Sequence, residues 1–196
     1  VSPLVSKNNR ELKFDFAKKP AFLSEESLNS AQKGSAMHAF MQFADFKKAK
    51  INLESEIKSL LERGFVSKEQ CEVLNRMQIT TFLKSNLCER ILASKNVSRE
   101  FRFAMNINAS EVVFDIKPEF SNEKIMLQGA IDCVFEEKDN LIVVDYKTDK
   151  IISSETLKKQ YAQQLELYAR ALRECTGKNV KEKVLYSFYT GTQIFL

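Results

Sequence analysis

The chain has 196 residues, of which 44% are hydrophobic and 29% are charged, and this balance excludes a mainly disordered chain. No apolar run approaches the roughly 20 residues that span a bilayer, and the N-terminus lacks the apolar core of a signal peptide. The formal net charge of +4 permits nucleic-acid binding but does not require it. We therefore expect a cytoplasmic protein.

The cysteines argue against a metal cluster. Four are present, widely separated, at Cys71, Cys88, Cys133 and Cys175. No Cys-x-x-Cys pair occurs among them, so their spacing predicts neither a zinc site nor an iron–sulfur cluster. Without a secretory signal we expect reduced thiols that are mostly buried.

The first half of the chain is predicted to be helical after an irregular segment over residues 1–23. Helix is expected to begin near Ser24, where two glutamates follow a serine cap, and a second helix to open at Gly34. Residues 52–94 show several short amphipathic patterns, of which residues 67–85 form one. We expect this stretch to be a helical insertion beside a sheet.

His38 is the only histidine, and it lies beside an apolar stripe near the start of the helix expected from Gly34. Taken alone, such a histidine is more often a packed or surface residue than a ligand. The small residues Gly34, Ser35 and Ala36 would let another part of the backbone approach this helix closely.

A strand is predicted over residues 97–107, where side chains alternate between two faces. Its Glu100 either points toward acidic residues of a neighbouring strand or is an ordinary exposed glutamate, and the pattern favours neither. A further strand is predicted over residues 111–117, followed by a loop over residues 118–123.

Two apolar runs, residues 130–135 and 141–146, predict a β-hairpin because both are rich in strand-forming residues and a short charged segment separates them. If residues 137–140 form the loop, opposed residues sum to 277, and Asp132 lies directly across from Asp145. Opposed Cβ atoms in such a pair lie about 4.5–5.5 Å apart. Lys147 follows two residues later and therefore projects from the same face as Asp145.

Two facing carboxylates in an apolar sheet destabilise it unless something offsets their repulsion. A divalent cation does so, and oxygen ligands suit magnesium or manganese. Such an ion polarises a phosphoryl oxygen and lowers the pKa of a bound water, while a lysine beside it stabilises charge developing on phosphorus. The alternative is a hairpin with salt bridges at a wet sheet edge, which the opposed Asp132 disfavours.

A long helix is predicted to begin at Ser153 or Ser154 and to end before Gly177. Gln164 and Tyr168 share one of its faces, because they are four residues apart. They either reach a phosphate or a base, or Tyr168 is core and Gln164 is its hydrogen-bonding partner. Residues 180–196 read as the last strands, so the order of elements predicts an α/β fold with a mixed sheet.

Five segments together resemble the PD-(D/E)XK nuclease superfamily, and within it the RecB-like branch. They are Gly34 to His38, Arg99 to Phe103, Gln128 to Asp132, Asp145 to Asp149, and Tyr161 to Tyr168. The resemblance covers roughly residues 30–190. It implies a restriction-endonuclease-like core, with a central mixed sheet flanked by helices, as a single nuclease domain over residues 24–196.

The resemblance also implies roles for individual residues. The implied metal ligands are His38, Asp132, Asp145 and the carbonyl of Tyr146. The implied catalytic residues are Asp132, Asp145, Lys147 as the catalytic lysine, Gln164 and Tyr168 as the pair that orients substrate and site, and Glu100 through a water.

The implied cofactor is Mg²⁺, for which Mn²⁺ or Ca²⁺ substitutes in binding, with no iron–sulfur cluster. The implied partners are DNA, as single-stranded ends, and a second protein of a bacterial helicase–nuclease complex. Lys47, Lys48 and Lys150 are candidates for holding phosphates, although any one of them taken alone is more often a solvated surface charge. No P-loop occurs, so no ATP site is expected in this fragment and the helicase motor would lie elsewhere. Two alternatives remain, a stand-alone structure-specific endonuclease and a non-catalytic DNA-binding or docking module.

Overall fold

A computed structural model describes residues 25–111 and 117–196. The described residues divide into two compact units, residues 104–111 with 117–129, and residues 25–103 with 130–196. The predictions of an irregular segment over residues 1–23 and of a helix cap at Ser24 lie outside the described residues.

The smaller unit contains the C-terminal part of β1 (Val97–Asn108) and the N-terminal part of β2 (Lys124–Glu137). Two 3₁₀ turns, Ala109–Glu111 and Pro118–Phe120, lie between these strands. The strand predicted over residues 111–117 falls almost wholly outside the described residues, and Glu111 itself ends a 3₁₀ turn.

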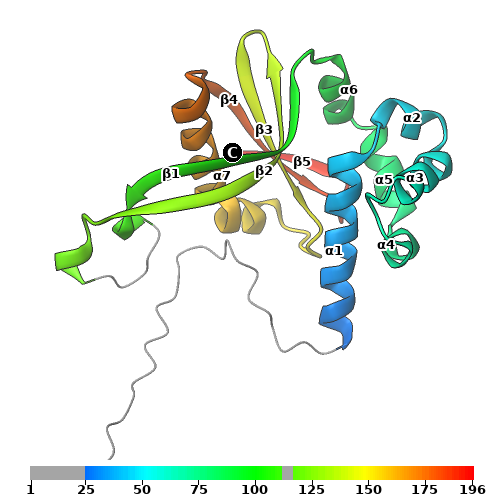
Figure 1. Cartoon of the computed structure of the whole chain (residues 1–196), viewed down its shortest axis with the longest axis horizontal. Coiled ribbons are helices and arrows are strands. Elements are labelled where there is room, and N and C mark those ends of the chain that lie inside the picture. Colours follow the sequence, from blue (N-terminus) through cyan, green and yellow to red (C-terminus); the bar gives the residue numbers. More distant parts are fainter. Residues whose placement is uncertain (1–24, 112–116) are drawn as a thin grey trace, which may run out of the picture. The chain divides into compact units, whose positions relative to one another are not determined.

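The five strands form one mixed sheet in the order β1-β2-β3-β4-β5, as Figure 1 shows. The last three are β3 (Asn140–Lys147), β4 (Val180–Ser187) and β5 (Thr192–Phe195). β2 pairs with β3 antiparallel, β3 with β4 parallel, and β4 with β5 antiparallel. The predicted α/β class with a mixed central sheet is confirmed.

Seven α-helices are described in the larger unit. They are α1 (Glu25–Phe43), α2 (Phe46–Ile51), α3 (Leu53–Glu62), α4 (Lys68–Val73), α5 (Arg76–Leu83), α6 (Asn86–Ala93) and α7 (Ser154–Thr176). Two sequence predictions were wrong in detail. Gly34 lies inside α1 and begins no helix. Residues 67–85 form two helices, because the side chain of Asn75 accepts a hydrogen bond from Gln78 N–H and caps a new one.

The register of the β2–β3 hairpin is the predicted one, since Glu136 pairs with Leu141 and Cys133 with Val144. The loop is shorter than predicted, because Glu137 still pairs with Asn140. Only Lys138 and Asp139 turn the chain, and both are left-handed, with φ of 47° and 64°. Two left-handed residues are typical of the tightest hairpin turn.

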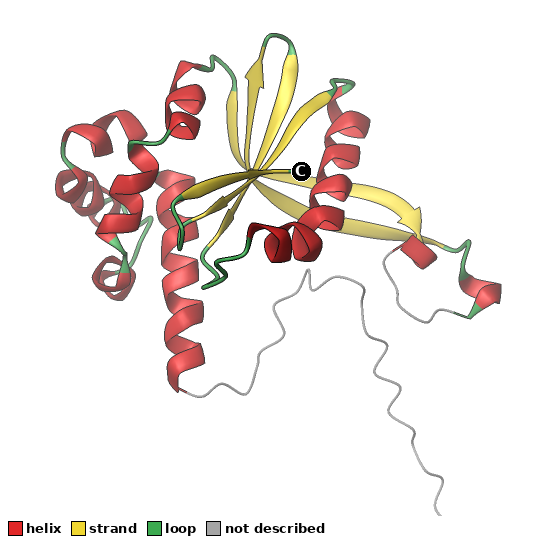
Figure 2. Cartoon of the chain, turned by 180° about the vertical axis from the view of Figure 1, so that it is seen from behind, coloured by secondary structure: helices red, strands yellow, loops and turns green. Residues whose placement is uncertain are grey.

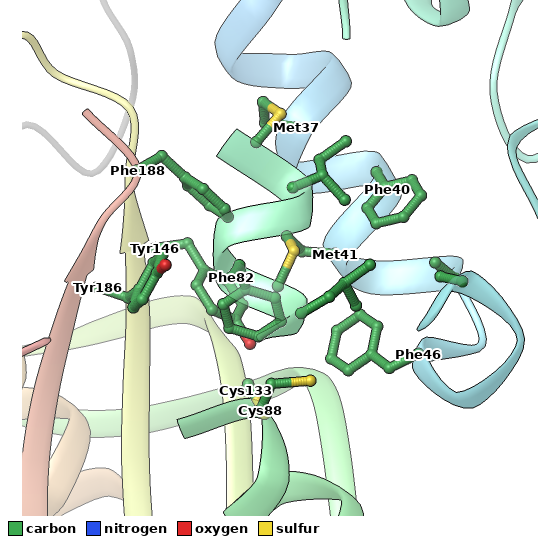
Figure 3. Packing of buried hydrophobic residues seen from close by; sticks show 14 of the residues in the cluster. Met37, Phe40, Met41, Phe46, Phe82, Cys88, Cys133, Tyr146, Tyr186 and Phe188 are labelled. Carbon is green, nitrogen blue, oxygen red and sulfur yellow. The ribbon is translucent and has the colours of Figure 1, made fainter. Parts of the chain in front are cut away.

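One face of the sheet packs against the helices that precede it. Tyr146 of β3, Tyr186 of β4 and the nearby Phe188 surround Phe82 of α5, with ring centroids 5.0–6.0 Å from its own (Figure 3). All four rings are at most 2% exposed. Cys71, Cys88 and Cys133 are buried in the same cluster and Cys175 is exposed, so the prediction of mostly buried thiols is confirmed.

The opposite face of the sheet is covered by α7, which Figure 2 shows away from the other helices. Leu157, Leu165 and Leu172 of α7 are buried at helical spacing. Alternation along β3 therefore turns Tyr146 toward the aromatic cluster and its neighbours Asp145 and Lys147 toward α7. No helix within the described ranges is long and apolar enough to cross a bilayer.

Gly177 ends α7 with a φ of 69°, and its N–H donates to the Arg173 carbonyl at 3.0 Å. An added Cβ would meet nothing within 4 Å, so only the backbone angle disfavours a larger residue. We expect Gly177→Ala to lower the free energy of unfolding by about 1 kcal/mol. Gly177→Asn should lose less, since asparagine tolerates this conformation. Urea unfolding of the three proteins measures the difference, and equal stability of all three would contradict it.

Candidate active site

The centre of the candidate site is an ion pair on the face of the sheet that α7 covers. Asp145 is 3% exposed, and its Oδ2 lies 2.7 Å from Lys147 Nζ. The Lys147 side chain is 14% exposed. Apolar strand residues on either side place both groups in a largely desolvated position, where electrostatic interactions are strong.

Asp132 reaches this centre from β2, and two elements orient it. The Tyr146 backbone N–H donates to Asp132 Oδ2 at 2.7 Å. His38 Nδ1 lies 3.2 Å from Asp132 Oδ1. The last observed pair of the β2–β3 register is Cys133 with Val144. The next pair in the same register would be Asp132 with Asp145, which is the predicted one.

His38 arrives on α1, which passes close to the segment after β3. A Cβ added to Gly34, one turn before His38, would lie 3.2 Å from Thr148 Oγ1. The predicted close approach at the small residues of α1 therefore occurs, although a side chain rather than a backbone makes it. The approach places His38 within contact distance of Asp132.

α7 supplies two more of the predicted residues. Gln164 Oε1 accepts from Lys147 Nζ at 3.3 Å, and Gln164 Nε2 donates to Tyr168 OH at 2.7 Å. Tyr168 is buried and packs edge-on against Phe103 of β1, with centroids 5.8 Å apart. The interpretation of Gln164 as the hydrogen-bonding partner of a core tyrosine is thus the one observed, and Gln164 also contacts Lys147. That the pair reaches a phosphate or a base stays a prediction.

Burial raises the pKa of the Asp145 carboxyl to about 6. The positive charge of Lys147 opposes this rise, and the negative charge of Asp132 adds to it. Burial also raises the pKa of Tyr168, with the charges of Asp145 and Asp132 adding to the effect. The site is therefore an acidic and largely desolvated group of side chains in which one lysine offsets two carboxylates.

The predicted site residues Glu100 and Tyr146 make no side-chain contact with the Asp145–Lys147 ion pair that is described for this structure. Glu100 lies in β1 with a left-handed φ of 55°, and its charge is the smallest cause that raises the pKa of Tyr168. The Tyr146 side chain points into the aromatic cluster (Figure 3), so only its carbonyl is available as a ligand.

The residue types fit a hard divalent cation. Asp145 Oδ2 is buried and has no hydrogen bond of good geometry within the described residues, despite the nearby ammonium group. The two carboxylates are oxygen ligands of the kind that Mg²⁺ and Mn²⁺ prefer, whereas an imidazole more often binds transition-metal ions. The described residues nevertheless hold no ready-made group of three such side chains. The Asp145 carboxylate is paired with Lys147, so binding of a cation by this carboxylate competes with that ion pair.

The sequence analysis gave Tyr161 no separate role, although its ring centroid lies 3.8 Å from Lys147 Nζ. Its spacing of three residues before Gln164 indicated a shared helix face. The predicted phosphate-binding lysines are exposed; Lys47 and Lys48 are far from the carboxylates in the chain, whereas Lys150 follows Lys147 by three residues. Lys47 and Lys48 begin α2, where Lys47 lines a hollow of about 470 Å³ with Arg99, and Lys150 follows β3.

The family profile of the PD-(D/E)XK nuclease superfamily matches residues 10–194. The chain is 42% identical over 179 residues to an ATP-dependent helicase/nuclease subunit of Thermoanaerobacter sp. (strain X514), covering 89% of this chain and 14% of that protein. It is 41% identical over 181 residues to the protein of the same name from Clostridium botulinum (strain Hall / ATCC 3502 / NCTC 13319 / Type A), covering 90% and 14%. The chain thus spans about one seventh of the length of these relatives. With the match extending over nearly all its residues, the chain belongs to the PD-(D/E)XK nuclease superfamily.

Proposed function

We propose that this chain is a metal-dependent DNA exonuclease domain of the AddA type, which processes double-strand-break ends for recombinational repair within a helicase–nuclease complex. The observation that carries the proposal is the contact of Asp145 with Lys147 beside an Asp132 held by His38 and the Tyr146 N–H. The relatives that are named as helicase/nuclease subunits support the same proposal.

In this proposal the metal is Mg²⁺, held by His38, Asp132, Asp145 and the Tyr146 carbonyl. When bound, it supplies Lewis-acid polarisation of a phosphoryl oxygen and lowers the pKa of a water. A low-dielectric site strengthens each of these interactions, because little water screens them.

The residues of α7 hold the lysine for this chemistry. Lys147 presents its ammonium group beside the carboxylates, where it stabilises negative charge that develops on the phosphate. Gln164 orients Lys147 through its carbonyl oxygen, and Tyr168 fixes Gln164 through its amide. Glu100 contributes through a water, as the resemblance implies.

Cleavage of a labelled single-stranded oligonucleotide with Mg²⁺ tests the nuclease assignment. We expect Asp145→Ala and Lys147→Ala each to lower the rate by about 100-fold or more, because each removes charge stabilisation in a desolvated site. Lys138→Ala, in the exposed hairpin turn, is the matched control and should cleave like wild type. Chelation of the metal should stop cleavage and added Mg²⁺ restore it. Equal rates for all four proteins would overturn the assignment.

A circular single-stranded substrate separates the proposed exonuclease from an endonuclease. An exonuclease needs an end, so the circle should survive while a linear strand of the same sequence is degraded. Cleavage of the circle would favour a structure-specific endonuclease. Binding of both substrates without cleavage would favour a docking module.

We also propose that the complete protein carries the helicase motor and assembles with an AddB-type partner in the bacterial cytoplasm. The relatives' length and names support this proposal. In the full-length complex, Asp145→Ala should leave ATP-driven unwinding intact and abolish degradation of the unwound strands. Loss of unwinding together with degradation would contradict the assignment of separate activities.

A further inference from the structure

Tyr161 lies on α7 one turn before Gln164, and its ring faces the ammonium group of Lys147. The distance from Lys147 Nζ to the ring centroid is 3.8 Å. At this separation the electron-rich face of an aromatic ring attracts a cation, and the attraction grows when water is excluded. The Lys147 side chain is 14% exposed, so little water competes for it.

The phenol group holds this ring in place. Tyr161 OH donates to Asp149 Oδ2 at 2.8 Å and accepts from Gln160 Nε2 at 3.0 Å. Asp149 lies two residues after Lys147, so the hydrogen bond ties α7 to the segment that carries the lysine. The ring is therefore anchored to the same piece of chain as the ammonium group that it faces.

Among the residues that the structure describes, Asp145, Gln164 and Tyr161 contact the Lys147 ammonium. Asp145 is also an expected metal ligand, and a carboxylate that turns to a cation weakens its ion pair. The two contacts from α7 use no carboxylate, so neither depends on the side chain that turns to the cation. Each is fixed by another group, Gln164 by Tyr168 and Tyr161 by Asp149.

We propose that Tyr161 is a positioning residue that holds Lys147 in place when Asp145 releases it to bind the metal. This inference rests on the proposed nuclease function and extends it to a residue that does not itself reach the reacting phosphate. It requires the aromatic ring and only secondarily the hydroxyl group.

Two variants separate the ring from the hydroxyl group. Tyr161→Leu keeps apolar bulk but removes the ring, and it should lower kcat about tenfold with KM within about twofold of wild type, because DNA contacts are unchanged while the lysine loses its position. Tyr161→Phe keeps the ring and should retain kcat within about twofold to threefold. If Tyr161 had a purely structural role, Tyr161→Leu would change KM and the free energy of unfolding together with kcat. Tyr161→Phe would then not restore kcat specifically.

A second readout needs neither metal nor activity. Lys147 Nζ lies 3.8 Å from the ring centroid, so the ring current should shift the NMR signals of the protons on the adjoining Cε upfield in the metal-free protein. The shift should remain in Tyr161→Phe and disappear in Tyr161→Leu. Its absence from wild type would overturn the contact and the inference with it.

The two readouts distinguish failure of this inference from failure of the proposed function. If wild type cleaves, Lys147→Ala does not, and Tyr161→Leu cleaves like wild type, the inference fails and the nuclease assignment stands. If wild type does not cleave at all, the nuclease assignment fails. The Lys147 signals then decide whether Tyr161 positions the lysine.

Discussion

Asp145→Asn is expected to abolish cleavage and, in the metal-free protein at about pH 7, to raise the free energy of unfolding by at least about 1 kcal/mol. The stability gain follows from the pKa of Asp145, which rises from 3.8 to about 6 on folding. Asparagine has nearly the same shape as a protonated aspartate and never ionises.

The sign of this effect fixes its pH dependence. A raised carboxyl pKa means that the folded state disfavours the ionised form of Asp145. The wild-type protein therefore has its full stability below pH 3.8, where this carboxyl is protonated, and loses part of that stability as the pH rises to about 6. The difference between Asp145→Asn and wild type should therefore be near zero at the acid end and reach its full value above pH 6. Urea unfolding at several pH values without metal measures it.

Asp139→Asn is the matched control, because Asp139 is exposed in the hairpin turn and left-handed, a conformation that asparagine tolerates. Its stability should stay within about 0.5 kcal/mol of wild type across the same pH range. Mg²⁺ should stabilise wild type more than Asp145→Asn, since the variant lacks one anionic ligand. A stability difference for Asp145→Asn that does not grow with pH would contradict the account.

The hairpin that carries this aspartate could be predicted from sequence because its information is local. Strand side chains alternate with a period of two, so one pairing determines all the others. The assumed pairing of Glu136 with Leu141 was the observed one. The loop was predicted two residues too long, but this error did not change the register, because the additional pair of Glu137 with Asn140 follows the same register. Opposition of the two carboxylates is a consequence of that register.

Contacts that join distant segments were harder to predict. His38 reaches Asp132 across 94 residues of sequence, and only the family resemblance indicated this contact. The ring of Tyr161 faces Lys147 because α7 crosses the sheet at one particular position, which no periodicity specifies. The end of α4 and the start of α5 were likewise not predicted, because the apolar spacing continues across them. The Asn75 side chain ends the continuous helical pattern there by capping α5.

Phe82→Ala is expected to lower the free energy of unfolding by about 3–5 kcal/mol, the range for removing a large aromatic side chain from a close-packed core. Phe82 is 0% exposed, and the Phe46, Tyr146 and Tyr186 rings lie at 5.3, 5.6 and 5.0 Å from it, all nearly edge-on. Truncation therefore loses dispersion contacts with rings from α2, β3 and β4 together, and leaves a cavity that none of them can fill alone.

The same substitution tests how the aromatic cluster supports the site on the opposite face of β3. Tyr146 lies between Asp145 and Lys147 in sequence, so its ring anchors the backbone from which both side chains project. Phe82→Ala should cleave at nearly the wild-type rate while folded, and lose activity at a lower temperature as the strand is released. Met77→Ala, on the same helix but 76% exposed, is the control and should stay within about 0.5 kcal/mol of wild type. Urea unfolding with a fitted m-value measures both variants, and a loss below about 1 kcal/mol for Phe82→Ala would contradict the central place of this ring in the core.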